Sequence, residues 1–131
     1  MNRLLITGSR DWSDEMTLVD QINWAVDLLD IQVLVHGDCP IGADPMADRA
    51  AKRLGLLVYK YPADWNAIRK AGLGPGPTRN QYMVDGGAEL CLAFPMPTSK
   101  GTWDTVRRCH TAGIPTLVTH PRKTTQRKAG Q

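Results

Sequence analysis

Short apolar runs alternate along the chain with segments in which apolar residues recur every three or four positions. The first pattern is typical of buried strands, and the second is typical of helices that bury one face. The predicted strands are residues 4–7, 31–36, 56–59, 90–94 and 116–118. The predicted helices are residues 14–29, 44–54, 78–84 and 102–112.

Capping signals mark two of the predicted helix starts. Ser13 or Asp14 can cap the first helix, because a short polar side chain can accept a hydrogen bond from a free amide of the first turn. Asp44 followed by Pro45 is the pair expected at the N-cap and first position of the second helix.

Strands that alternate with helices favour an α/β fold, because consecutive parallel strands need a crossover helix. We predict a single Rossmann-like domain over residues 1–121. Its five-stranded, mainly parallel sheet has the order 3-2-1-4-5 and is flanked by helices. The length of 131 residues fits one domain. Residues 122–131 are expected to form a basic, disordered tail.

The formal net charge of +3 belongs to this tail. Arg122, Lys123, Arg127 and Lys128 carry its positive charges, and without them the net charge is −1. A nucleic-acid partner is not expected, because such a partner requires a basic folded surface. No stretch approaches the roughly 18 apolar residues of a membrane helix, and the apolar run at residues 4–6 is too short for a signal peptide. We therefore expect a cytoplasmic protein without a membrane partner.

The three cysteines form no CxxC pair. Cys91, in an apolar run, and Cys109, on a helix, are expected in the core of a protein from a reducing compartment. Cys39, in a glycine-rich loop, is expected to be exposed. A zinc site made from the cysteines at 39 and 109 with His36 and His110 would match no standard spacing. Neither a metal nor a cofactor is predicted.

Three loops that follow predicted strands are candidates for a binding site, because ligands of open parallel sheets bind at the carboxyl ends of the strands. Each loop contains glycine, which lets backbone amides approach an anion, and two of the loops lead into helix N-termini, which favour phosphate. The predicted ligand-binding residues are Gly8, Ser9, Arg10, Gly37, Asp38, Gly42, Asp44, Arg79, Asn80, Ser99, Lys100, Gly101 and Thr102. Arginine 79 offers a planar fork suited to phosphate. The expected partner is a small phosphorylated ligand.

Five motifs in a fixed order resemble the YspA/YpsA-related branch of the SLOG superfamily. They read ITGSR, HGDCPIGAD, YPADW, GPTRNQYM, and AFP with SKGT, and the resemblance covers about residues 3–118. It implies a Rossmann-like fold and a ligand that is a nucleotide or is derived from one. Members of this branch occur in bacteria and their phages.

The better understood relatives in this superfamily are the LOG-type phosphoribohydrolases, which cleave the N-glycosidic bond of nucleoside 5′-monophosphates. The resemblance places Arg79 at their functional arginine, and Gly101 with Thr102 matches part of their glycine-rich loop. Thr105 stands where that loop has a glutamate. Threonine lacks the carboxylate that stabilises an oxocarbenium-like transition state, so the sequence leaves open whether the chain is an enzyme.

Three functions remain as hypotheses. The first is binding or sensing of a nucleotide-type ligand at the carboxyl ends of the strands. The second is nucleotide hydrolysis with a displaced carboxylate, for which Asp38, Asp64 and Asp104 are weak catalytic candidates. The third is binding of single-stranded DNA, as in the superfamily member DprA. A charge of −1 outside the tail and a single Phe argue against the third. The LOG-type relatives also imply a homo-oligomer by analogy.

Overall fold

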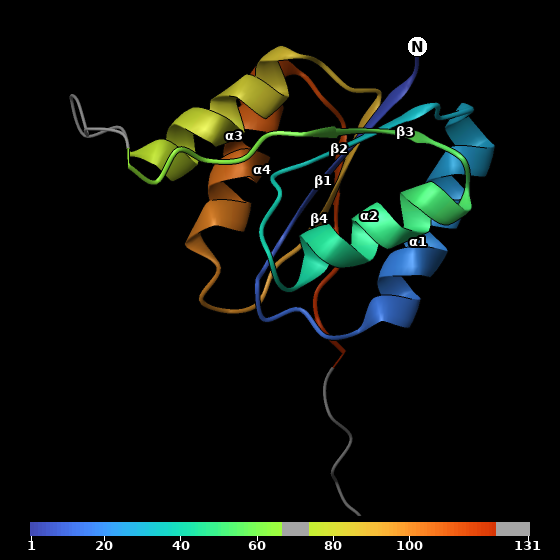
Figure 1. Ribbon diagram of the computed structural model, residues 1–131, viewed down its shortest axis with the longest axis horizontal. Coiled ribbons are helices and arrows are strands. Elements are labelled where there is room, and N and C mark those ends of the chain that lie inside the picture. The colour runs from blue at the N-terminus through green and yellow to red at the C-terminus, as the bar shows by residue number, and fades with distance from the viewer. Residues whose placement is uncertain (67–73, 123–131) are drawn as a thin grey trace, which may run out of the picture.

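The apolar runs form a parallel sheet in the computed structural model, which describes residues 1–66 and 74–122 (Figure 1). The strands are β1 (Arg3–Gly8), β2 (Val33–His36), β3 (Leu57–Lys60), β4 (Leu90–Phe94) and β5 (Thr116–Val118). They pair in the order β3-β2-β1-β4-β5, and every pair is parallel. The predicted Rossmann-like α/β fold and its strand order are confirmed.

Helices cover both faces of this sheet. Within the described residues they are α1 (Glu15–Leu29), α2 (Ala43–Arg53), α3 (Pro75–Asp85) and α4 (Lys100–Ala112). The first two lie together on one face, and the last two lie together on the other (Figure 1). The sheet is therefore the middle of three layers.

Two apolar cores separate these layers, because successive residues of a strand point to opposite faces. Leu4 and Ile6 of β1 pack with Leu18 and Ile22 of α1. Leu5, between them, packs on the other face with residues of α3 and α4. A strand buried on both faces needs a continuous apolar run, as β1 and β4 have. This rigid centre holds the loops at the carboxyl edge of the sheet.

The predicted cap is confirmed for α1 and wrong for α2. Asp14 caps α1 as predicted, since its carboxylate accepts the Thr17 N–H at 3.1 Å. The prediction that Asp44 caps α2 is wrong. The N-cap is Gly42, whose φ of 85° and ψ of −138° suit a residue without a side chain. Asp44 therefore lies in the first turn of α2, where its carboxylate is available for other contacts.

The helices α3 and α4 begin earlier than predicted. α3 starts at Pro75, because proline is tolerated in a first helical turn, where its missing amide would have had no partner. α4 starts at Lys100, directly after its N-cap Ser99. Both shifts bring more residues of the predicted loops into first helical turns.

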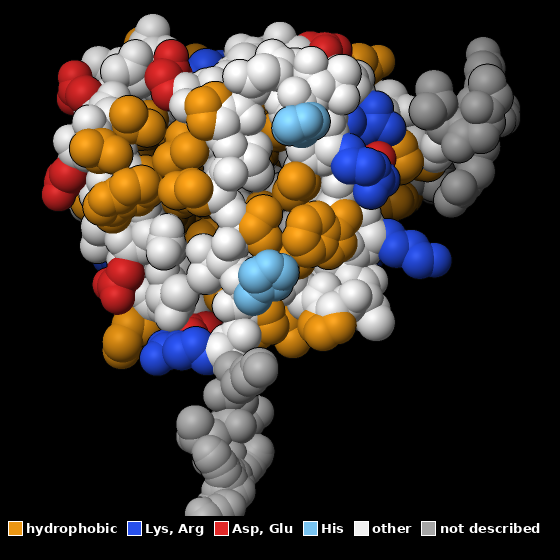
Figure 2. Space-filling model, turned by 180° about the vertical axis from the view of Figure 1, so that it is seen from behind, with side chains coloured by type: hydrophobic (Ala, Val, Ile, Leu, Met, Phe, Trp, Pro, Cys, Tyr) orange, Lys and Arg blue, Asp and Glu red, His pale blue; other side chains and the backbone are white. Residues whose placement is uncertain are grey.

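Figure 2 shows the opposite face of the molecule, where imidazole side chains and hydrophobic patches are exposed. His110 and His120 are exposed, whereas His36 is buried in β2. Among the described residues, no helix is long and apolar enough to cross a membrane.

One residue of the predicted tail makes a defined contact. The guanidinium of Arg122 lies 3.0 Å from the carboxylate of Asp14 at the start of α1. The rest of the predicted tail lies outside the described residues.

Candidate functional site

A cavity of about 550 Å³ opens at the carboxyl edge of the sheet, between the loops after β1, β2 and β4 and the helices α3 and α4. Its volume is in the range of small-molecule sites. The predicted ligand-binding residues that line it are Gly8, Ser9, Arg10, Gly37, Asp44, Arg79, Asn80, Ser99, Lys100, Gly101 and Thr102. Asp38 and Gly42 belong to the same loops but do not line the cavity.

The loop after β1 touches both neighbouring loops, and glycine makes this approach sterically feasible. The Ser9 N–H donates to the Phe94 carbonyl at 3.0 Å, and the Ala43 N–H donates to the Ser9 carbonyl at 3.2 Å. A side chain at Gly8 would collide with Ala43, and one at Gly42 would collide with the backbone of the β1 loop. Gly42 thus shapes the cavity without lining it.

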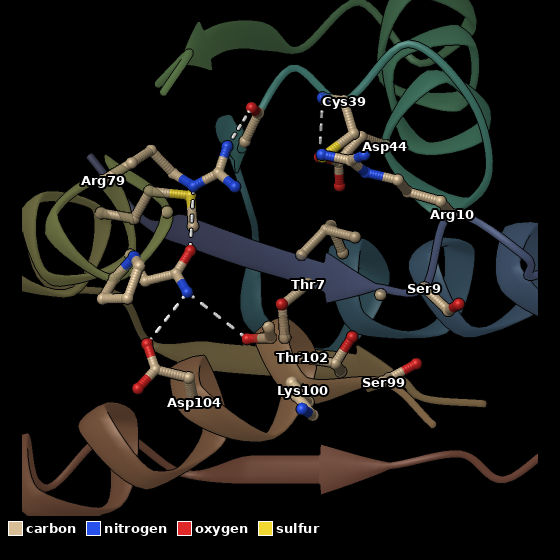
Figure 3. Close-up of a pocket in the computed structure, with 18 of the residues that line it drawn as sticks. Thr7, Ser9, Arg10, Cys39, Asp44, Arg79, Ser99, Lys100, Thr102 and Asp104 are labelled. Carbon is tan, nitrogen blue, oxygen red and sulfur yellow. Dashed lines mark hydrogen bonds between the residues drawn. The ribbon is translucent and has the colours of Figure 1, made fainter. Parts of the chain in front are cut away.

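The first turn of α4 forms one side of the cavity. Amides in a first helical turn have no acceptor within their own helix. Ser99, the N-cap, makes no capping bond, because its hydroxyl accepts the Met96 N–H at 2.9 Å instead. Figure 3 shows Ser99, Lys100 and Thr102 together on one side of the end of β1. This side presents free backbone donors and the positive end of a helix dipole.

Arg79 lies on α3 and lines the cavity, and its guanidinium already has protein acceptors. Its Nη1 donates to the carbonyls of Gly37 and, at 3.2 Å, Tyr61, and its Nε donates to Asn80 Oδ1 at 2.9 Å. The side chain therefore fastens the loop after β2 to the segment after β3. These contacts hold the guanidinium at the cavity wall, where Arg79 was predicted to bind the ligand.

Asp104 of α4 joins Asn80 at the same wall. Asn80 donates to the Asp104 carboxylate at 3.0 Å, and Arg108 donates to it at 2.8 Å. Burial raises the pKa of Asp104, but the hydrogen bonds from Arg108 and Asn80 and the positive charge of Arg107 outweigh burial and lower it. Asp104 is therefore ionised, and its negative charge is balanced by ion pairs with Arg107 and Arg108.

The pKa of Asp44 is shifted in the opposite direction to that of Asp104. Its carboxylate is buried and accepts the Cys39 N–H at 3.1 Å. Burial raises the pKa of Asp44, and the Cys39 hydrogen bond and the nearby Arg79 charge offset burial only in part. Burial, together with Asp44, also raises the pKa of Cys39, so this half-buried residue stays a thiol at neutral pH. Figure 3 shows Arg10, Cys39 and Asp44 together, away from the first turn of α4.

Two of the three weak catalytic candidates do not line the cavity. Asp38 has a φ of 57°, and its N–H donates to the Nδ1 of buried His36 at 2.9 Å. Asp64 accepts the Asn66 N–H at 3.2 Å in a local turn. Asp104 is the candidate that the structure places at the cavity.

Thr105, at the glutamate position of the LOG-type loop, is fully buried and hydrogen-bonds the Gly101 carbonyl of its own helix. No group of three or more residues able to hold a metal occurs in residues 1–66 and 74–122.

Several lining residues were not in the predicted set. They are Ile6, Thr7, Asp11, Cys39, Trp65, Gly76, Pro77, Met83, Thr98, Asp104 and Arg107. Asp104 was considered only as a catalytic carboxylate. The available signal for Trp65 was its position in the YPADW motif, which directly follows β3.

Comparison with known proteins identifies the relatives of this chain. Residues 2–67 match a family model described as the YspA, cpYpsA-related SLOG family. The Gene 61 protein of Mycobacterium phage D29 is 40% identical over 126 residues, which covers 89% of this chain and 95% of the phage protein.

Two solved structures share the fold. The molybdenum cofactor binding protein from Rippkaea orientalis has a TM-score of 0.68 and 17% identity, over 92% of this chain and 77% of that chain. The Moco Carrier Protein from Chlamydomonas reinhardtii has a TM-score of 0.64 and 16% identity, over 89% of this chain and 75% of that chain. At these identities the likeness concerns the fold alone. The family-model match and the phage relative show that this chain belongs to the YspA, cpYpsA-related SLOG family.

Proposed function

We propose that the cavity at the carboxyl edge of the sheet binds a small phosphorylated ligand, a nucleotide or a molecule derived from one. The observation that carries this proposal is the uncapped N-terminus of α4, which faces the cavity with Ser99 engaged elsewhere. An anion accepts hydrogen bonds from such amides and is favoured by the helix dipole.

Neighbouring side chains support an anionic ligand. Arg10 and Lys100 are exposed and line the cavity, so both are accessible to a phosphate. Arg107 lines it as well, with its side chain 70% exposed. Among the carboxylates of the wall, Asp104 is neutralised by its hydrogen-bonded partners. Lys100, an exposed residue of the first turn of α4, therefore supplies positive charge beside the free amides.

A phosphorylated pterin is a second candidate ligand. The two proteins that share the fold are a molybdenum cofactor binding protein and a Moco carrier protein, and this cofactor is a pterin that bears a phosphate. The phosphate end fits the first turn of α4 as a nucleotide phosphate does.

Hydrolysis of the ligand is the alternative function, and the place of Asp104 on the cavity wall is the observation that favours it. In that case Asp104 would supply the carboxylate that Thr105 lacks. Chromatography of nucleoside 5′-monophosphates incubated with the protein measures it directly. Release of free base that is lost in Asp104→Asn would establish an enzyme, and no release would support binding alone.

A thermal-shift screen tests the binding proposal. The panel pairs each nucleoside 5′-monophosphate and a phosphorylated pterin with its unphosphorylated counterpart, at two salt concentrations to expose nonspecific charge effects. A ligand at a hundred times its Kd stabilises the folded state by about 2.7 kcal/mol, which raises Tm by about 10 °C for a domain of this size. We expect such a shift from at least one phosphorylated compound and a much smaller shift from its counterpart. Equal shifts within every pair would overturn the proposal.

A further inference from the structure

Among the described residues that line the cavity, Trp65 is the one large hydrophobic side chain that is exposed. Its side chain lines the cavity and is 59% exposed. Tryptophan gains stability from burial, so a tryptophan kept in water at a cavity wall contributes little to folding. Gly76, at the start of α3, is the glycine nearest the ring, and a Cβ placed there would lie 3.6 Å from it.

A planar cation already lies over this ring. The guanidinium carbon of Arg10 lies 5.6 Å from the centroid of the Trp65 ring. Arg10 is itself exposed, so this contact is not enforced by packing. Guanidinium groups and aromatic heterocycles share a flat shape that suits an indole face. The contact demonstrates that a face of the indole is accessible to a flat group within the cavity.

We infer that the ligand carries an aromatic heterocycle, which stacks on the indole of Trp65 while its phosphate lies at the first turn of α4. This inference rests on the proposed function and names the residue that would hold the ring of that ligand, which sugar phosphates and inorganic phosphate lack. Trp65 is in this view a specificity-determining residue. Every base can stack on an aromatic side chain, so the indole of Trp65 selects for a ligand with a ring and not for a particular base.

Paired ligands separate the ring from the phosphate. We would measure Kd by calorimetry for nucleoside 5′-monophosphates and a phosphorylated pterin, and for ribose 5-phosphate, which keeps a phosphate and loses the ring. Removal of a stacking residue weakens binding by about 10- to 100-fold. Trp65→Ala is expected to have this effect on the ring-bearing ligands and to leave the affinity for ribose 5-phosphate unchanged. Trp65→Phe should retain most of the affinity.

Trp24 offers a matched control. It is an exposed tryptophan of α1, 46% exposed, and it does not line the cavity. Ligand binding should quench tryptophan fluorescence in the wild type and in Trp24→Phe, and the quenching should be lost in Trp65→Phe.

The outcomes separate the inference from the proposed function. Equal affinities for ring-bearing ligands and ribose 5-phosphate would overturn the stacking inference and leave phosphate binding intact. An equal loss of both affinities in Trp65→Ala would overturn it as well. If no phosphorylated compound binds, the proposed function and the inference both fail.

Discussion

Two walls of the same cavity differ in whether their polar groups already have hydrogen-bond partners within the protein. The first wall, called here the anion wall, consists of the Gly8–Ser9 turn and the first turn of α4 from Ser99 to Thr102. The second, called the clamp wall, consists of Gly37, Cys39 and Asp44 from the loop after β2, with Arg79, Asn80 and Asp104. The anion wall has amides without acceptors in their own helix. On the clamp wall, side-chain donors and carboxylates are paired with each other or with backbone groups.

This difference indicates which charged residues are free to bind a ligand. A cationic side chain at a cavity can bind an anionic ligand. If its N–H groups already donate to protein acceptors, however, those hydrogen bonds must break before it can donate to the ligand. Buried donors and acceptors that lose their partners cost about 1–3 kcal/mol each. We therefore expect substitutions on the clamp wall to affect stability first and substitutions on the anion wall to affect affinity first.

The largest expected effect lies at the junction between the walls. Gly42→Ala would place a Cβ against the Ser9 carbonyl and the Arg10 backbone, at a φ of 85° that side chains rarely adopt. Backbone strain and overpacking together should cost about 3–5 kcal/mol in unfolding free energy. Denaturant titration measures this loss.

Gly55→Ala is the control for this substitution. Gly55 also has a positive φ, 73°, but a Cβ there would meet nothing within 4 Å. Strain alone should cost about 1 kcal/mol. Equal losses in the two variants would show that the contact between the loops does not constrain Gly42.

Arg79→Ala is expected to have the next largest effect. Its guanidinium bonds the carbonyls of Gly37 and Tyr61, and loss of charged hydrogen bonds should lower the unfolding free energy by about 2–3 kcal/mol. Affinity of the still-folded protein should fall less than about tenfold. Arg107→Ala, at an exposed side chain of the same cavity, should change stability by less than about 0.5 kcal/mol. An Arg79→Ala protein as stable as the wild type would contradict the clamp assignment.

Asp44→Asn should gain stability relative to the wild type as the pH rises through the folded-state pKa of Asp44. Because burial raises the folded-state pKa of Asp44, the folded state favours the protonated acid. The wild type therefore loses stability relative to the variant as pH rises above 3.8, the unfolded-state value, through the raised folded pKa. Thermal melts between pH 3.5 and pH 8 should show the gap opening as pH rises.

Asp48→Asn is the control of opposite sign. Burial raises the pKa of Asp48, but hydrogen bonds from Lys52 and His36 outweigh burial and lower it. Its stabilising contribution is present above 3.8, the unfolded value, and is lost as pH falls through the folded pKa. Asp48→Asn should therefore be less stable than the wild type at neutral pH, with the gap closing in acid. The same pH trend in both variants would contradict the assigned environments.

The sequence predicted the fold well because the signals were local and repeated. Each strand could be recognised as an apolar run. Because the strands alternate with helices, only a few strand orders are compatible with a parallel sheet. The position of the cavity followed from the same rule, since the loops after β1, β2 and β4 share one edge of the sheet. Loop glycines such as Gly8 and Gly37 could therefore be placed at a common site before any contact was known.

Side-chain assignments within the site were less predictable, because they depend on contacts between residues distant in the chain. Arg79 bonds a carbonyl 42 positions away, and nothing local to the TRN segment indicates this. Asp44 looked like a helix cap because its sequence context with Pro45 is the usual one, yet Gly42 takes that position. Thr105 was compared with a glutamate by motif alone, although its side chain is fully buried and Asp104 lines the cavity instead.

The smallest effect on stability is expected at Lys100, the first residue of α4. Its side chain is exposed, so Lys100→Ala should change the unfolding free energy by less than about 0.5 kcal/mol. The same variant should weaken binding of a phosphorylated ligand only a few-fold, because an exposed ion pair contributes less than about 1 kcal/mol. Lys100→Pro additionally removes the backbone N–H at a helical position that proline favours, after a residue in extended conformation. Loss of a hydrogen bond to a charged group should then weaken binding by about 10- to 100-fold, with the melting temperature nearly unchanged. Calorimetric titration of both variants with the best phosphorylated compound separates the ammonium from the amide. Equal affinities in the two variants would show that the backbone of the anion wall does not hold the phosphate.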